Sequence, residues 1–155
     1  MDASAATGPQ IDGTGYSFHV PDGWGEPDEP VPGFDPDSFA MNGRDKDDFA
    51  DNVNVLLFPG GSLTPDEAEK AARDELASVG VKDVVVNSRV QVGGNPSAHV
   101  TGQASINDLD YTVEQYYPTD DDQAYVVTFS FSADVPAEQR MRVTDATLVS
   151  WKWTD

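Results

Sequence analysis

The chain has 155 residues, of which 28 are acidic and 9 are Lys or Arg, and its formal net charge is −19. This charge would repel the phosphates of nucleic acid and of an anionic membrane surface, so neither is an expected partner. Cysteine is absent, which excludes disulfides, thiol catalysis and thiolate metal ligands. No apolar run approaches the roughly 18 residues that a membrane-spanning helix needs.

The N-terminal segment is small and polar, beginning Met-Asp-Ala-Ser-Ala-Ala-Thr-Gly-Pro. It lacks the basic region and the apolar core of a signal peptide. We therefore expect residues 1–13 to form a flexible tether, or the end left when an export segment is removed. Residues 14–155 are expected to form a single α+β domain, whose length allows roughly two thirds of the unfolded surface to be buried.

The first predicted strand covers residues 16–20, where Tyr16, Phe18 and Val20 alternate with polar side chains. This period of two is typical of a strand with one buried face. Pro-Asp-Gly then predicts a turn that ends the strand, and Trp24 follows that turn directly.

A loop, a short strand and a longer strand are expected next. Residues 25–37 contain four prolines, which exclude a long helix or a central strand. A short strand is predicted at residues 38–41, and a more regular one at residues 53–58. The segment between them, residues 45–51, is rich in aspartate and predicts a loop.

The clearest local signal predicts a helix over residues 65–79. Thr64 is a good N-cap, Pro65 occupies the first helical position, and Glu67 completes a capping box. Gly80 supplies the C-terminal stop. The apolar residues that recur at helical spacing are Ala68, Ala72, Leu76 and Val79, with Ala71 beside them. This narrow, mostly alanine face suits close packing on a sheet.

Four strands joined by short turns are predicted after this helix. Apolar and polar residues alternate over residues 84–92, 98–106, 111–117 and 125–132. The turns are marked by Gly93-Gly94-Asn95, Asn107-Asp108 and Asp120-Asp121-Asp122. Connections this short require antiparallel strands, because a parallel crossover needs a dozen or more residues.

Pro136 opens a second predicted helix that runs to residue 149, with Ala137, Met141 and Leu148 on one face. Taken together, the elements predict an α+β fold. Its antiparallel β-sheet has six or seven strands and is packed with the two helices.

Catalytic and cofactor-binding signals are missing from the sequence. The histidines, His19 and His99, both fall on the polar phase of their predicted strands, so we expect them to face solvent. Neither has neighbours at the spacing of a zinc site or of an acid–base pair. No Gly-x-Ser-x-Gly elbow and no phosphate-binding glycine loop is present. The sequence therefore predicts no catalytic residue, no metal and no cofactor.

Two aspartate-rich segments stand out. Asp45, Asp47, Asp48 and Asp51 could form an acidic interaction surface, and calcium could bind such a loop. The regular Asp-x-Asp-x-Asp-Gly pattern with a distal glutamate is absent, so a solvated loop is the alternative interpretation. We interpret the second segment, Asp120–Asp122, as the tip of a hairpin.

The tryptophans Trp24, Trp151 and Trp153 form the second candidate site. They could line a pocket, or they could anchor the two ends of the chain to the core, which is common for large aromatic side chains. Trp151 and Trp153 would point to the same side of an extended segment.

The segment Gly15–Trp24, Gly-Tyr-Ser-Phe-His-Val-Pro-Asp-Gly-Trp, resembles the opening of the PsbP-like group. The Asn-Val-Asn-Val strand at residues 52–55, the helix after it, the strand Tyr125–Phe129 and the closing Ser150-Trp151 are also similar. This group includes the photosystem II extrinsic protein and a Ran-binding nuclear import factor. The LpqN-type lipoproteins of actinobacteria are the most similar in style.

The resemblance implies an α/β/α sandwich around an antiparallel sheet, and it implies binding or accessory roles without enzyme activity. Bacterial members are often exported and tethered through a lipidated cysteine. Because this sequence has no cysteine, a lipid anchor would have to lie outside it.

Three functional hypotheses follow. The first is a non-catalytic, extracytoplasmic binding or accessory domain, the soluble part of a bacterial lipoprotein with an unknown protein or small-molecule partner. The second is a cytoplasmic protein-interaction module that uses its acidic face against a basic partner. The third is a small-molecule binder or hydrolase with a pocket between the sheet and a helix, near Trp24 or Trp151.

Overall fold

The computed structural model describes residues 4–27, 36–43, 50–106 and 108–154. Its strands are β1 (Gln10–Asp12), β2 (Tyr16–His19), β3 (Trp24–Gly25), β4 (Ser38–Asn42), β5 (Asn52–Leu57), β6 (Lys82–Val86), β7 (Val90–Val92), β8 (Asn95–Ser97), β9 (His99–Ile106), β10 (Leu109–Tyr116), β11 (Tyr125–Ser132) and β12 (Lys152–Trp153). Its helices are α1 (Pro65–Ser78) and α2 (Ala137–Val149).

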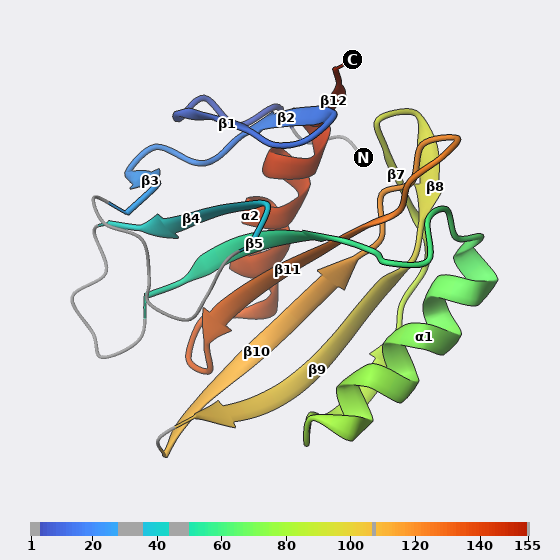
Figure 1. Cartoon of the computed structure of the whole chain (residues 1–155). Coiled ribbons are helices and arrows are strands. Elements are labelled where there is room, and N and C mark those ends of the chain that lie inside the picture. The colour runs from blue at the N-terminus through green and yellow to red at the C-terminus, as the bar shows by residue number, and fades with distance from the viewer. Residues whose placement is uncertain (1–3, 28–35, 44–49, 107, 155) are drawn as a thin grey trace.

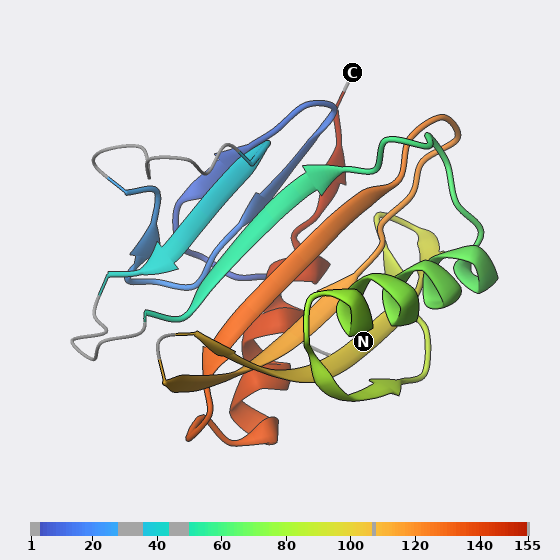
Figure 2. The ribbon, with the colours of Figure 1, turned by 60° about the horizontal axis from the view of Figure 1, so that its bottom comes forward.

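Seven strands form one antiparallel sheet in the order β3-β4-β5-β11-β10-β9-β6 (Figure 1). Three more form a small sheet in the order β1-β2-β12, and β7 and β8 form a separate hairpin. The two helices lie on opposite faces of the large sheet, and the small sheet shares the face that α2 covers (Figure 1, Figure 2). The predicted α+β fold with a seven-stranded antiparallel sheet and two helices is confirmed.

Each face of the large sheet carries its own hydrophobic cluster. In β11, Tyr125, Val127 and Phe129 pack toward α2 and the small sheet. Val126 points the other way and packs with the buried alanines of α1. Both phases of this strand are therefore apolar, as is typical of a strand that is covered on two sides.

The predicted capping of α1 is confirmed. The Thr64 side chain accepts a hydrogen bond from the Glu67 backbone N–H, and the Glu67 side chain accepts one from the Thr64 backbone N–H. The helix ends where Gly80 adopts φ +84°, which lets the Val81 N–H reach the Leu76 carbonyl at 2.9 Å. Only Val79 departs from the predicted apolar face, because it lies beyond the last turn and is 69% exposed.

The prediction of one continuous strand over residues 84–92 is wrong. β6 ends at Val86 and pairs with β9, whereas β7 begins at Val90 and pairs with β8. Between them the Asn87 N–H still bonds to the His99 carbonyl, at 2.8 Å, before the chain leaves the sheet edge. Alternating valines cannot reveal such a break, because the period of two continues across it.

The predicted flexible segment 1–13 is wrong for residues 10–12, which form β1. This strand pairs with β2, placing Ile11 opposite Phe18. Ile11 is only 1% exposed and belongs to the cluster on the α2 face. A single buried isoleucine among small polar residues gives too weak a periodic pattern to predict a strand.

The apolar face predicted for α2 is only partly correct. Leu148 is buried as expected, but Met141 is half-buried and Ala137 is exposed. The other buried residues of this helix are Thr144 and Thr147. Neither helix in the described part of the chain is long and apolar enough to cross a membrane.

Candidate functional site

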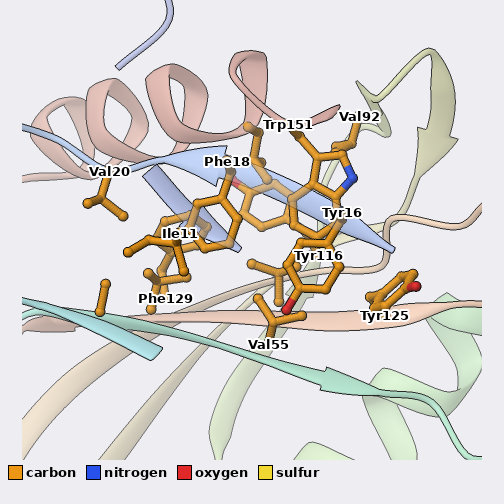
Figure 3. Close-up of a cluster of buried hydrophobic side chains, with 14 of the residues drawn as sticks. Ile11, Tyr16, Phe18, Val20, Val55, Val92, Tyr116, Tyr125, Phe129 and Trp151 are labelled. Atoms are coloured by element: carbon orange, nitrogen blue, oxygen red, sulfur yellow. The ribbon is translucent and has the colours of Figure 1, made fainter. Parts of the chain in front are cut away.

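Trp151 and Trp153 lie side by side near the C-terminus. Trp151 belongs to the core, and Trp153 lies at its edge and is partly exposed. Trp151 is 4% exposed, and its ring stacks on Tyr16 at 4.5 Å and on Phe18 at 5.6 Å between centroids (Figure 3). Trp153 is half-buried and meets Trp151 edge to face, with centroids 5.5 Å apart. Trp24 is also buried in this cluster.

The short strand β12 holds these rings in place. Trp153 pairs with Tyr16 across the small sheet. Just before β12, the Ser150 hydroxyl oxygen accepts a hydrogen bond from the His19 N–H at 2.7 Å. The end of α2 is thereby fastened to β2, and the following residues are directed toward the β7–β8 hairpin.

A shallow depression lies between the β7–β8 turn and the end of α2. Its volume is about 660 Å³. The residues that line it are Gln91, Gly93, Gly94, Leu148, Val149, Trp151, Lys152 and Trp153. Of the three tryptophans considered for a pocket, Trp151 and Trp153 line this depression and Trp24 does not.

The two indole N–H groups differ in their hydrogen bonding. Trp153 Nε1 donates to the Gly93 carbonyl at 3.0 Å, which orients its ring over the turn. Trp151 Nε1 is buried and has no hydrogen-bond partner among the described residues. Figure 3 shows this nitrogen turned toward the side of the cluster where Val92 and the β7–β8 hairpin lie. An unsatisfied buried donor of this kind costs about 1–3 kcal/mol.

A second depression, of about 380 Å³, adjoins the first at Trp153. Its lining residues are Gly15, Asn95, Asp120, Asp121, Asp122, Trp153 and Thr154. The predicted hairpin tip is present, since Asp120 Oδ1 accepts hydrogen bonds from the N–H groups of Asp122 and Gln123 at 2.9 and 2.8 Å. Asp121 and Asp122 are exposed.

Carboxylates lie close to Tyr125 beside this second depression. Burial, and then the carboxylates of Asp120 and Asp37, raise the pKa of Tyr125, whose hydroxyl donates to the Thr14 carbonyl at 2.7 Å. Tyr125 also contacts Trp153, with ring centroids 5.8 Å apart. The aromatic surface and the acidic hairpin therefore belong to one continuous region, which we call the Trp153 site: the two depressions and the residues that line them.

A buried ionisable network lies elsewhere, between the sheet and α2. The Glu114 carboxylate, 1% exposed, accepts hydrogen bonds from His99 Nε2 and Thr101 Oγ1, both at 2.7 Å, and from Arg140 Nε at 3.0 Å. Burial alone would raise the pKa of Glu114, but these hydrogen bonds outweigh burial and lower it. His99 also stacks on Tyr116 at 4.3 Å.

The prediction that His99 faces solvent is wrong, because α2 covers the face of β9 on which it lies; the residue is 7% exposed. His19 is half-buried, and its Nδ1 donates to the Gly8 carbonyl at 2.9 Å. The hairpin register could have revealed the network. A turn near residues 107–108 pairs His99 with Tyr116 and Thr101 with Glu114, which puts His99 and Glu114 on one face.

This network connects α2 to the large sheet. Glu114 Oε1 accepts from His99 and Thr101, and Oε2 accepts from Arg140 of α2. None of these side chains lines either depression of the Trp153 site. The arrangement fastens α2 to the sheet.

Of the four aspartates proposed to form an acidic interaction surface, only Asp51 is among the described residues, and it does not lie on the surface. Asp51 is 7% exposed, and its Oδ1 accepts a hydrogen bond from the Ser132 N–H at 2.9 Å, which ties β5 to the end of β11. The prediction for this residue is therefore wrong. Asp45, Asp47 and Asp48 lie outside the described residues. Within the described part of the chain, no group of three or more acidic or histidine side chains is placed to hold a metal ion.

Sequence comparison finds no matching family model and no matching curated protein. Solved structures do match. Yeast Mog1p, a Ran-binding protein of Saccharomyces cerevisiae, is 11% identical, with a TM-score of 0.62 over 96% of this chain and 97% of that one. Cyanobacterial PsbP (CyanoP) of Synechocystis sp. PCC 6803 is 14% identical, with a TM-score of 0.60 over 99% and 98% of the two chains.

LpqN of Mycobacterium tuberculosis, described as involved in cell envelope biogenesis, is 19% identical, with a TM-score of 0.58 over 96% of this chain and 86% of that one. A Bacteroides thetaiotaomicron protein matches at 17% identity and a TM-score of 0.57, but the chain spans only 50% of its length.

These likenesses, together with the topology, define the class as an α+β domain with helices on both faces of a seven-stranded antiparallel sheet. More narrowly, the chain has the Mog1p/PsbP-like fold, so the resemblance found in the sequence is confirmed at the level of the fold. The structural similarity establishes the fold. Because the sequences are only 11 to 19% identical, it does not establish an activity.

Proposed function

We propose that this chain is a non-catalytic, extracytoplasmic binding or accessory domain, carried by a bacterial lipoprotein. The observation that carries the proposal is the match, over 96% of this chain, to LpqN, which is described as involved in cell envelope biogenesis. Mog1p, of the same fold, is described as a Ran-binding protein, which supports a binding role.

The composition of the Trp153 site supports binding over catalysis. The residues that line it in the described part of the chain include two tryptophans and three aspartates, but no histidine and no serine. They therefore offer aromatic and carboxylate surface to a ligand without pairing a nucleophile with a base. The buried network around Glu114, which does contain a histidine, is enclosed beneath α2.

The compartment can be tested by fractionation. The gene is expressed in its own host with its natural upstream sequence, and the protein is followed through cell fractionation, detergent phase partition and protease treatment of spheroplasts. We expect it in the envelope fraction and the detergent phase, digested by external protease while a cytoplasmic marker is protected. Recovery with the cytoplasmic marker would overturn the proposal and favour a cytoplasmic interaction module that uses its acidic surface.

A further inference from the structure

We propose that the Trp153 site receives an extended basic peptide segment of a partner protein. The segment's apolar residues would lie in the depression beside Trp151, and its Lys or Arg residues would lie against Asp120–Asp122. This inference rests on the proposed binding function and names the chemistry of its ligand.

Charge complementarity argues for the basic residues. The exposed carboxylates of Asp121 and Asp122 border the same depression as the half-buried ring of Trp153. A guanidinium or ammonium group in that depression would contact both a carboxylate and the face of an indole. The formal net charge of the whole chain is −19, and this negative charge would speed the approach of a basic partner.

The unpartnered indole N–H of Trp151 argues for a ligand with hydrogen-bond acceptors. Trp151 is 4% exposed, lines the apolar depression, and points its Nε1 toward the β7–β8 side (Figure 3). An extended peptide presents a backbone carbonyl about every 3.3 Å along its length. Such a carbonyl can accept a hydrogen bond from this N–H whatever the side chains of the peptide are. Because the nitrogen itself is buried, the proposal requires the β7–β8 turn to move outward when the peptide binds.

Lys152 determines the direction of the segment. It lines the apolar depression beside Leu148 and Val149, so a ligand cation placed there would be repelled. The basic residues of the segment are therefore expected at the hairpin end of the site, with the apolar residues at the α2 end.

The indole N–H signals of ¹⁵N-labelled protein provide the test. The chain has three tryptophans, so Trp24, which lies outside the site, is an internal control. The probe is the peptide acetyl-Leu-Ala-Arg-Lys-Arg-amide, and its matched control carries Glu in place of each basic residue. We expect the basic peptide to shift the Trp151 and Trp153 signals and not that of Trp24, and we expect the acidic peptide to shift none.

Two charge variants separate the site from the overall charge. Asp121→Asn with Asp122→Asn should weaken binding of the basic peptide at least fivefold, roughly the effect of losing two partly desolvated charge pairs. Asp74→Asn with Asp134→Asn removes the same charge from exposed positions on α1 and before α2, and should change binding less than about twofold. Circular dichroism confirms that each variant is folded.

Three results would overturn the proposal. The first is the absence of any shift at Trp151 and Trp153 with millimolar basic peptide. The second is equal weakening by the two charge variants, which would indicate only unspecific attraction. The third is the same pattern of shifts with arginine amide alone, which would indicate a small-cation site. The fractionation experiment tests the compartment independently. If the protein is exported but does not bind the peptide, the proposed function stands and only the proposed ligand is wrong.

Discussion

Gly93 and Gly94 are adjacent in the turn between β7 and β8, yet only one of them faces the tryptophans. Both have positive φ, +60° and +86°. A Cβ on Gly93 would overlap Trp153 Nε1 and lie 2.9 Å from its Cε2, whereas a Cβ on Gly94 would meet nothing within 4 Å. The first glycine is therefore required by the site and the second only by the turn.

We expect Gly93→Ala to lower the free energy of unfolding by about 1–3 kcal/mol, because the new methyl group overpacks the indole. The indole N–H signal of Trp153 should move, since its hydrogen bond to residue 93 is displaced. Gly94→Ala is the matched control and should cost about 1 kcal/mol through its backbone conformation alone, leaving that signal in place. Urea denaturation and the indole spectrum measure both effects; an unmoved Trp153 signal in Gly93→Ala would contradict the geometry.

The Glu114 network makes a second prediction for single residues. Glu114→Gln should lower the free energy of unfolding by about 3 kcal/mol, because Arg140, whose side chain is 15% exposed, loses its only carboxylate partner among the described residues and keeps the Val135 carbonyl. Glu69→Gln is the control: it removes a carboxylate that pairs with Arg89 at 3.0 Å on the surface, and should cost less than about 1 kcal/mol. If the two variants lose the same free energy of unfolding in urea denaturation, the buried ion pair stabilises the fold no more than the surface pair does.

The same carboxylate determines a pH dependence. Its pKa in the folded protein lies below the ordinary value of 4.5, so Glu114 stabilises the fold above that value. This stability is lost as the pH falls through the folded pKa. The urea midpoint of the natural protein should therefore decrease as the pH falls below 4.5, and that of Glu114→Gln should decrease less steeply. Parallel pH profiles for the two proteins would contradict the prediction.

Among the elements, β1 shows how far the N-terminal segment belongs to the domain. Besides its pairing with β2, the preceding Ala6 N–H bonds to the Ala146 carbonyl of α2 at 2.9 Å. Removing these contacts should expose the core beneath Ile11.

A chain that starts at residue 14 should therefore lose about 2–4 kcal/mol of stability, the usual cost of removing a buried isoleucine side chain. A chain that starts at residue 4 keeps all these contacts and should melt like the full-length protein. Thermal unfolding monitored by circular dichroism compares the three. Identical melting temperatures would mean that β1 is a tether after all.

At the scale of the whole molecule, the excess of 28 acidic over 9 basic residues opposes folding through self-repulsion. Raising the salt from about 20 mM to about 500 mM should increase the melting temperature by a few degrees, because it screens repulsion between surface charges. A variant with Asp74, Asp121, Asp122 and Asp134 replaced by Asn should respond less. A melting temperature that falls with added salt would contradict this account.

The elements that could be predicted from the sequence are those whose signals are local. The capping box of Thr64 and Glu67 lies within one helical turn, and the period of two in β11 lies within eight residues. Such patterns report which backbone conformation each segment prefers, and they were sufficient to predict the α+β class and its antiparallel sheet.

Features that depend on distant contacts could not be predicted in this way. The local pattern of β9 predicts that His99 faces solvent. That pattern does not indicate that α2 packs on this face of the strand and supplies Arg140. The sequence indicates a possible pocket at Trp151 and Trp153, but their neighbours, Gly93 and the Asp120–Asp122 hairpin, come from other parts of the chain.

By itself, then, the sequence determined the local conformations, the strong negative charge and the absence of thiol chemistry. Only the tertiary structure decided that β1 joins the core, that Glu114 is satisfied beneath α2, and that Trp153 joins two depressions into one site. The physical reason is that burial and charge pairing depend on which surfaces pack together, and those surfaces are far apart along the chain.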